Sequence, residues 1–324
     1  MLKELRFVQG AVAKKDFIPA MTHFRIEGGH VRSFNGTIAL SSPLAFDIDC
    51  TPQAATLVKA ISQCGDEVIQ LSVTPAGRLK VQAGKFKAFI ELIEGDTPHI
   101  MPQGERVDFD GEKLMKALKV LFPFTGDDAS RTWTNGVLLH DEFAFATNNV
   151  SVVQYWLGVK TPVTVNLPKL AVTEMLRIGE APTYAQIDRD SVTFHFPDER
   201  WVRTQLYETS WPDIGRILDV KSNPVAVDER LFEGLDMLQP FADNIGRVFI
   251  KDEVMRTHPV GDTGETELGA SFDIPGFTPT GIYQMKILAL LKGVATHADF
   301  SRYPEHTMFF GENLRGALAP MKGF

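Results

Sequence analysis

Six segments of the chain repeat apolar residues at the i, i+3, i+4 spacing of an amphipathic helix. Leu114, Leu118 and Leu121 show this spacing in one of them. Another begins with Thr51-Pro52, which predicts an N-cap hydroxyl followed by a proline at the first helical position. The predicted helices cover residues 1–15, 51–65, 112–126, 169–180, 230–244 and 286–300.

Shorter segments between these helices alternate apolar and polar residues with period two, as half-buried antiparallel strands do. Turn residues bound most of them. The pattern predicts six small units, each with one helix laid against a few antiparallel strands. The predicted strands include Thr22–Glu27, Val68–Val73, Arg78–Gln82, 86–94, Gly136–Leu139, Tyr184–Ile187, Ser191–Phe196, Val202–Tyr207 and Val248–Lys251.

Two pairs of short motifs recur at nearly the same distance along the chain. Glu-x-x-x-Pro-x-Ile starts at Glu94 and again at Glu208, 114 residues later, each time after a predicted strand. The turn Phe34-Asn35-Gly36 and its counterpart Thr147-Asn148-Asn149 are 113 residues apart. This period predicts an α+β fold of three repeated domains, each holding two helix-and-strand units. The predicted domains are residues 1–106, 107–219 and 220–324.

The chain is acidic, with a net charge of -8, which by itself disfavours nucleic-acid binding. The distribution of charge reverses that inference. The six predicted helices hold 13 Lys and Arg against 8 Asp and Glu, while the rest of the chain holds 20 against 33. Basic helices in an acidic protein fit a surface that faces phosphate. The alternative is that the helices carry lysine only on an ordinary solvated face.

Two of the predicted helices contribute most of this positive charge. We expect them to contact DNA through Lys3, Arg6, Lys14 and Lys15 in the first helix and through Lys113, Lys116 and Lys119 in the third. Helix 230–244 departs from the pattern, because Glu233, Asp236 and Asp243 make it acidic. A lining built from these helices would therefore be uneven in charge.

No motif in the sequence indicates an enzyme. The eight histidines have no catalytic or metal-ligand spacing, and the glycine-rich stretch 261–269 lacks the Gly-Lys-Ser/Thr ending of a nucleotide loop. Cys50 and Cys64 form no CxxC pair and predict reduced thiols. No apolar run reaches the roughly 18 residues of a membrane span, and charges interrupt the N-terminus. We therefore expect a cytoplasmic protein without catalytic residues, metal or cofactor.

Two other places have the composition of contact surfaces. Arg131 and Trp133 follow the third helix, where a guanidinium beside an aromatic ring can hold phosphate and stack on an unpaired base. The alternative is a strand-edge tryptophan covered by the arginine. The C-terminal Pro320 and Met321 could form an adaptable surface for a peptide, or a frayed terminus.

The whole chain resembles the bacterial DNA sliding clamps, the beta subunits of DNA polymerase III, in a shortened phage-type form. Leu2-Lys3-x-Leu5 through Lys14-Lys15-x-x-Ile18-Pro19 is similar to the family's first helix and the basic loop after it. Arg131-Thr-Trp-Thr-Asn135-Gly136, followed by Ala146-Thr147-Asn148, is similar to a strand and turn of the family's second domain. Ala319-Pro320-Met321-Lys322 is similar to its C-terminal Met-Pro-Met-Arg.

The resemblance implies a non-catalytic processivity factor whose ring is a head-to-tail homodimer with helices lining the hole. Its implied partners are double-stranded DNA of any sequence, and a polymerase and a clamp-loader ATPase that bind through short peptide motifs. By position, Lys15, Arg131 and Trp133 match DNA-contacting residues. The implied peptide pocket consists of Thr134, Thr147, Val152, Leu218, Pro320 and Met321.

Three departures from the family pattern stand beside this resemblance. The family's first strand has no counterpart before the first helix. Thr147-Asn-Asn-Val-Ser-Val152 lacks the His and Arg of the family's Thr-Asp-Gly-His-Arg-Leu turn, and Asp219 replaces a proline. These changes predict a pocket for a different peptide motif, which suits a virus that supplies its own polymerase. Two alternatives stay open: a monomeric, non-ring processivity factor, and a viral structural protein built from repeated β-rich modules.

Overall fold

The computed structural model describes residues 1–15, 18–46, 48–94, 98–161, 163–207, 211–258 and 269–323. Its contacts divide the chain into two compact units. The first unit contains Met1–Met115 and Leu167–Glu208, and the second contains Lys116–Asn166 and Thr209–Phe324. Both units combine distant parts of the chain and cut across the predicted middle domain 107–219, so the three domain boundaries stay a prediction.

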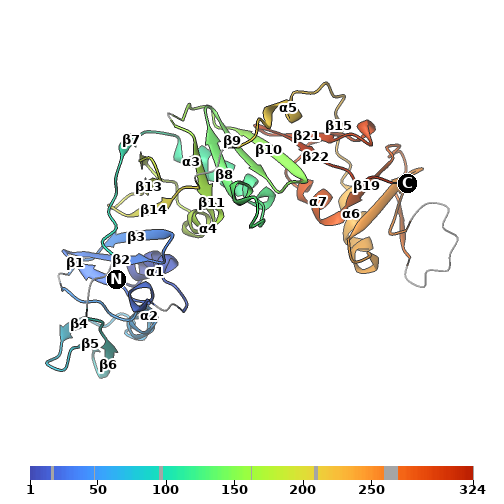
Figure 1. Ribbon diagram of the computed structural model, residues 1–324. Coiled ribbons are helices and arrows are strands. Elements are labelled where there is room, and N and C mark those ends of the chain that lie inside the picture. Colours follow the sequence, from blue (N-terminus) through green and yellow to red (C-terminus); the bar gives the residue numbers. More distant parts are fainter. Residues whose placement is uncertain are drawn as a thin grey trace. The chain divides into compact units, whose positions relative to one another are not determined.

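The first unit is built on a seven-stranded antiparallel sheet in the order β1-β2-β3-β14-β13-β12-β7. Strands from both ends of the unit lie side by side in it (Figure 1). Its strands are β1 Arg25–Glu27, β2 His30–Phe34, β3 Ile38–Pro43, β7 Glu105–Val107, β12 Tyr184–Ile187, β13 Ser191–His195 and β14 Trp201–Gln205. A separate three-stranded sheet consists of β4 Ile69–Val73, β5 Arg78–Ala83 and β6 Phe86–Glu91.

Helices cover the first unit's sheets with the apolar faces that the sequence pattern predicts. They are α1 Leu2–Val8, α2 Ala54–Ser62 and α4 Lys169–Ile178, and α3 Gly111–Leu121 begins in this unit. Helix α1 buries Leu5, Phe7 and Val8 and contacts β2, β3 and α2. The carboxylate of Asp110 accepts the Lys113 N–H at 3.0 Å at the start of α3, which satisfies one of the unpaired N–H groups there.

The second unit contains an eight-stranded sheet in the order β11-β8-β9-β10-β22-β21-β20-β15, with β9 and β10 beside β22 and β21 (Figure 1). Its strands are β8 Gly136–His140, β9 Phe143–Thr147, β10 Ser151–Trp156, β11 Val165–Pro168, β15 Val225–Ala226, β20 His297–Asp299, β21 Thr307–Gly311 and β22 Leu314–Leu318. A four-stranded sheet in the order β18-β17-β16-β19 consists of β16 Arg247–Lys251, β17 Val254–Arg256, β18 Ser271–Asp273 and β19 Gly281–Gln284. The helices are α5 Gly215–Leu218, α6 Arg230–Leu238 and α7 Met285–Leu288.

The internal repeat is visible in the hydrogen bonds of two hairpin turns. The Asn35 side-chain oxygen accepts the N–H groups two and three residues later, at 3.1 and 3.0 Å. Asn148, 113 positions further on, accepts the same two N–H groups, at 3.1 and 2.8 Å. The ladder repeats as well, because Arg25 faces Arg32 in the first unit and Leu138 faces Phe145 in the second. The second repeated motif, from Glu94 and Glu208, lies partly outside the described residues.

Each predicted strand named above overlaps a strand of the structure, but three predictions about helices are wrong. The first helix ends at Val8 and a 3-10 turn continues it only to Ala11, so Lys14 and Lys15 lie in a bend. The second helix is capped by Gln53, whose side chain accepts the Thr56 N–H at 2.7 Å. Thr51 is not its cap, because Pro52 forms an isolated bridge with Leu92 and continues the sheet.

The predicted helix 286–300 is mostly not helical. It comprises the last three residues of α7, a 3-10 turn over Ala289–Leu291, a loop, strand β20 and the first residue of the 3-10 turn Phe300–Arg302. Gly293 adopts a left-handed φ of 70°, which ends any helical run. The other 3-10 turns cover Pro19–Thr22, Phe122–Phe124, Thr132–Thr134, Gln239–Phe241 and Phe300–Arg302. Most of the glycine-rich stretch 261–269 lies outside the described residues. Among the described helices, none is long and apolar enough to cross a membrane.

Replacing Asp299 by asparagine is expected to destabilise the second unit. The side chain is almost fully buried, and burial alone would raise the pKa of Asp299. Its carboxylate accepts N–H groups from Asn223 at 2.8 Å and Ser301 at 3.2 Å and the Ser301 hydroxyl at 2.6 Å, and these bonds hold the pKa below its ordinary value. A lowered carboxyl pKa contributes stability above about pH 4 that is lost as the pH falls.

We expect Asp299→Asn to lower the free energy of unfolding by about 1–3 kcal/mol at pH 7. The difference from the wild type should shrink in acid, where the wild-type carboxylate becomes protonated. Urea unfolding at pH 7 and near pH 3 measures both values. An equal difference at the two pH values would show that the carboxylate charge plays no part.

Candidate nucleic-acid interface and peptide pocket

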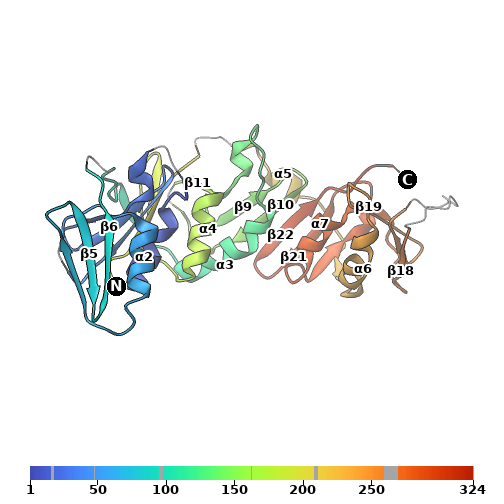
Figure 2. The ribbon, with the colours of Figure 1, turned by 90° about the horizontal axis from the view of Figure 1, so that it is seen from below.

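The helices of the described chain are basic, as the sequence indicates. The seven α-helices hold eleven Lys and Arg against five Asp and Glu. In the first unit, the Arg177 guanidinium of α4 donates to the Phe7 carbonyl of α1 at 2.7 Å, which fixes the two helices side by side. Figure 2 shows α2 and α4 of this unit. Lys3 and Arg6 are exposed on α1, and Lys59 is exposed on α2, which contacts α1. These helices therefore carry three exposed basic side chains close together.

The other predicted DNA-contacting lysines lie in two places. Lys14 and Lys15 are both exposed in the bend after α1. On α3, Lys116 is exposed and Lys113 is half-buried. In the second unit, α6 keeps its acidic character, and its Asp236 carboxylate is 2.9 Å from the Lys292 ammonium. The positive charge is thus confined to some of the helices.

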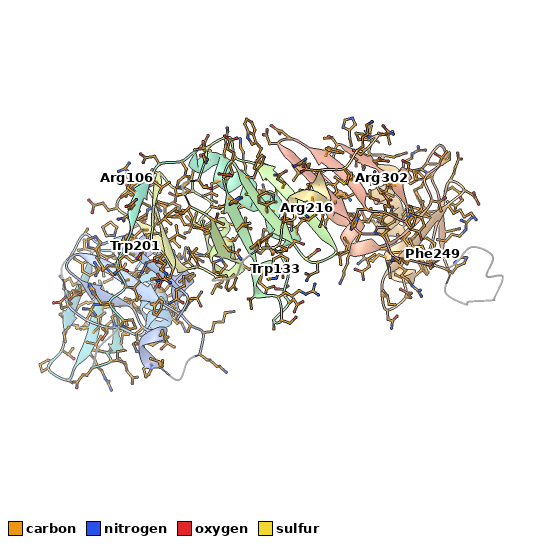
Figure 3. The ribbon with its side chains drawn as sticks, turned by 45° about the horizontal axis from the view of Figure 1, so that its top comes forward. Arg106, Trp133, Trp201, Arg216, Phe249 and Arg302 are labelled. Atoms are coloured by element: carbon orange, nitrogen blue, oxygen red, sulfur yellow. The ribbon has the colours of Figure 1, made fainter. Side chains whose placement is uncertain are left out.

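Arg131 and Trp133 lie in different surroundings. The exposed Arg131 guanidinium donates to the Asn149 side chain at 3.0 Å and remains available to solvent. Trp133, which Figure 3 labels, is half-buried. Its ring makes an edge-to-face contact with the Trp211 ring, with 5.0 Å between the ring centroids. Trp133 lies in the 3-10 turn Thr132–Thr134 and packs on Trp211, which itself packs against the apolar cluster of the predicted pocket, so it is not the strand-edge tryptophan covered by Arg131 that the alternative describes. Its contact with DNA stays a prediction.

The predicted pocket residues Val152 and Leu218 meet in one apolar cluster of the second unit. Strand β10 supplies Val152, and Leu218 comes from α5, which lies on the same sheet. The remaining members of the cluster are Leu138, Phe145, Ile214, Met308 and Ala317, with Phe143, Trp211 and Phe310 packed against it. The Trp211 indole N–H is buried without a hydrogen-bond partner among the described residues. A buried donor of this kind can donate a hydrogen bond to a carbonyl oxygen of a bound peptide.

Thr147 lies beside this cluster, Thr134 lies in the 3-10 turn Thr132–Thr134, and both are buried. Thr147 is the cross-strand neighbour of Val152, and its hydroxyl donates to the Ser151 carbonyl at 2.6 Å. The Thr134 hydroxyl donates to the Arg131 carbonyl at 2.9 Å. Both threonines therefore stabilise their own turns, and their hydroxyls are used internally.

The C-terminal residues are held at two points. The Ala319 N–H donates to the Val150 carbonyl at 2.8 Å, close to the cluster, and the Met321 N–H donates to the Ile282 carbonyl of β19 at 2.7 Å. The Tyr303 hydroxyl donates to the Met321 carbonyl at 3.2 Å. Pro320 and Met321 are half-buried in this arrangement. The terminus is therefore ordered through Met321, and the frayed alternative does not describe it.

Several residues of the cluster were not foreseen from the sequence. Leu138 and Phe145 join Met308 in one cluster because β10 pairs with β22, which links two hairpins far apart in the chain. Trp211 lies within the motif that starts at Glu208, but nothing in the local pattern indicates that it packs against the cluster. The alternation of the strand places Phe145 on the same face as Thr147, so the sequence pattern could have suggested Phe145 as a member of the pocket.

No protein-family model and no curated protein matches the sequence. The structure, in contrast, is similar over nearly its whole length to solved sliding clamps. A sliding clamp (DNA polymerase III subunit beta) from Pseudomonas aeruginosa bound to griselimycin is 14% identical, with a TM-score of 0.83, and the alignment covers 100% of this chain and 97% of that one. Polymerase III beta from Caulobacter crescentus is 17% identical, with a TM-score of 0.83 and coverage of 99% and 97%. The clamp from Bartonella birtlesii bound to griselimycin is 15% identical, with a TM-score of 0.84 and the same coverage.

At these identities the likeness establishes the fold. The chain has the sliding-clamp fold, and the α+β class of helices with antiparallel strands predicted from its sequence is confirmed. The resemblance first drawn from three short motifs thus extends to the architecture of the chain.

Proposed function

We propose that this chain is a DNA sliding clamp, a non-catalytic subunit that encircles duplex DNA and tethers a polymerase to it. The observation that carries the proposal is the similarity of fold to solved sliding clamps along the entire chain. The excess of basic residues on the helices of an acidic protein supports DNA as the ligand. Scattered lysines give a diffuse attraction to phosphate without reading sequence, which a sliding protein requires.

The strand order of the four sheets indicates how copies of the chain would join. In the seven-stranded sheet, the meander β1-β2-β3 joins the meander β12-β13-β14 through their third strands, β3 and β14. In the eight-stranded sheet, β8-β9-β10 joins β20-β21-β22 in the same way, through β10 and β22. The third strands of the two remaining meanders, β6 and β18, are edge strands of their described sheets.

We infer that β6 of one copy pairs with β18 of the next. The contact is heterologous, because the two strands belong to different parts of the chain, and such contacts give rings when the rotation closes. Closure at two copies gives the head-to-tail dimer that the resemblance implies. An unpaired edge strand is also a liability for aggregation, so pairing would protect both edges.

Small-angle X-ray scattering tests the ring. We expect a forward-scattering mass of about twice the 36.0 kDa of the chain and the distance distribution of a hollow particle. A compact or rod-like monomer would end the encirclement proposal. It would favour a monomeric processivity factor or a viral structural protein.

We further propose that the cluster around Val152 and Leu218 receives short peptide motifs from the polymerase and from a clamp-loader ATPase. Apolar side chains gathered beside half-buried Trp211 form the kind of surface on which a peptide anchors. A loader would have to supply the ATP-driven opening, because the sequence has no nucleotide-binding motif. The missing His and Arg in the turn 147–152 support a partner motif particular to a phage-type replication system.

Leu218→Ser is expected to weaken binding to this cluster at least tenfold, because it removes a buried apolar side chain worth roughly 1.5–3 kcal/mol. Griselimycin, which the similar clamps bind, is a suitable probe, and the emission of the Trp133–Trp211 pair reports its arrival. Ile217→Ser is the matched control, because Ile217 is the neighbouring residue of α5 and is 39% exposed. Equal affinities of both variants and the wild type would place the ligand elsewhere.

A further inference from the structure

Strand β4 has an open edge, which distinguishes it from the equivalent strands of the chain. The four sheets contain six three-stranded meanders, and β4 is the first strand of the meander β4-β5-β6 (Figure 1). In the other five meanders the outer edge of the first strand is covered. Cys50 bridges β1 at Ile26, and β11, β7, β19 and β15 lie beside β8, β12, β16 and β20. Among the described residues, no strand pairs with the outer edge of β4.

The exposure of β4 agrees with this difference. None of its five residues is buried, whereas each of the other five first strands contains at least one buried residue. Val73 at the end of β4 is 46% exposed, and Val68, directly before its start, is 81% exposed. The structure describes residues 48–94, which include the whole meander and α2, without a gap. The first strand of this meander therefore lacks the neighbour that shields its counterparts.

The turn after β4 shows which of its backbone groups face outward. The Thr74 N–H donates to the Arg78 carbonyl at 2.8 Å, so the backbone of Thr74 is directed toward β5. Alternate residues of an antiparallel strand face its partner. The N–H and C=O groups that point to the open edge therefore belong to Ile69, Leu71 and Val73. These three donors and three acceptors can pair with another extended strand.

The two faces of the sheet differ in chemistry beside this edge. The Leu71 side chain lies on the apolar face, opposite the buried Val81 of β5. The other face carries Arg78 and Lys80 of β5, and no Asp or Glu of β4 or β5. The acidic residue of that face, Glu91, lies on β6 at the far edge of the sheet. A strand added to β4 would extend the apolar face on one side and meet basic side chains on the other.

We propose that the open edge of β4 binds an extended peptide of a partner protein, in which apolar and acidic side chains alternate. The peptide adds a strand to the sheet, as the covering strands do in the other meanders. Main-chain hydrogen bonds supply its affinity, and the alternation supplies its specificity. Asp66 and Glu67 precede β4, so the acidic side chains lie toward the Val73 end. This inference does not depend on the clamp proposal or on the pairing of β6, because β4 forms the opposite edge of the sheet.

Hydrogen exchange of the wild-type protein, followed by NMR, tests the site directly. The probes are two eight-residue peptides, one alternating valine with glutamate and the other alternating valine with lysine. We expect the glutamate peptide to slow exchange of the Ile69, Leu71 and Val73 amides at least tenfold, and the lysine peptide to bind at least tenfold more weakly. No slowing by either peptide, or equal slowing by both, would overturn the proposal. Slowing that needs no peptide and increases with protein concentration would also overturn it, because a second copy would then occupy the edge.

Leu71→Pro and Leu71→Ala separate the outward N–H from the side chain. Both substitutions remove the leucine side chain, but only proline removes the N–H and places its ring at the edge. We expect the glutamate peptide to bind Leu71→Pro at least tenfold more weakly than Leu71→Ala, as measured by fluorescence anisotropy of the labelled peptide. Equal affinities of the two variants would mean that the peptide does not pair with β4. The exchange measurement uses the wild-type protein and does not depend on the folding of either variant.

Discussion

Replacing Phe89 by aspartate is expected to convert the protein from a dimer to a monomer at micromolar concentration. Phe89 lies on β6, the edge strand that we propose to pair with β18 of a second copy, and is 55% exposed. It points away from the sheet's helix-covered face, because its neighbour Ile90 is buried. A large exposed aromatic side chain on an unpaired edge strand is typical of an interface.

The size of the effect follows from the closed geometry. Burying most of a phenylalanine side chain contributes roughly 2–3 kcal/mol, and a charge in its place adds a desolvation cost. A head-to-tail dimer contains this contact twice, so the loss is doubled. We therefore expect the dissociation constant to rise about a thousandfold or more.

Ser72→Asp is the matched control for this substitution. Ser72 lies in the same cross-strand row, because Lys80 of β5 pairs with both Ser72 and Phe89, but it belongs to β4 at the opposite edge. It is exposed, and the substitution introduces the same charge. Sedimentation equilibrium should find a dimer for Ser72→Asp and a monomer for Phe89→Asp. Two dimers, or a monomeric control, would reject β6 as the joining strand.

The sequence predicted local structure well where a segment's own pattern decides it. Tyr184–Ile187 was predicted with the bounds that the structure has, because its turns and alternation are local features. The turns at Asn35 and Asn148 were recognised from three residues each, since the asparagine side chain makes its bonds two and three residues ahead. The basic character of the helices also follows from composition alone.

Features that depend on distant pairing could not be predicted in this way. The apolar cluster unites Phe145, Met308 and Leu218, and no local pattern shows that β10 pairs with β22. The failed helix 286–300 has the same origin, because β20 gains its partner β21 only in the folded sheet. Tertiary pairing overrides a helical pattern of this length.

Changing Lys14 and Lys15 together to alanine is expected to weaken DNA binding to a similar degree for every sequence. Both ammonium groups are exposed in the bend that follows α1, at the position where the resemblance implies a basic loop against the duplex. Each phosphate contact releases about 0.9 counterion from B-form DNA. Loss of two contacts should therefore lower the slope of log affinity against log salt by about 2, and the affinity at low salt by roughly tenfold.

The control must remove the same charge from another part of the surface. Lys160 and Lys221 are both exposed and lie outside the described helices, so their double alanine variant has the same net charge as Lys14→Ala/Lys15→Ala. Fluorescence anisotropy with duplexes of different sequence, at several salt concentrations, gives the affinity and the slope together. If the bend faces the phosphates, only the Lys14/Lys15 variant loses slope, and it does so equally for every duplex. Equal losses in the two variants would mean that net charge alone sets the affinity, and the bend would then have no special place in the DNA interface.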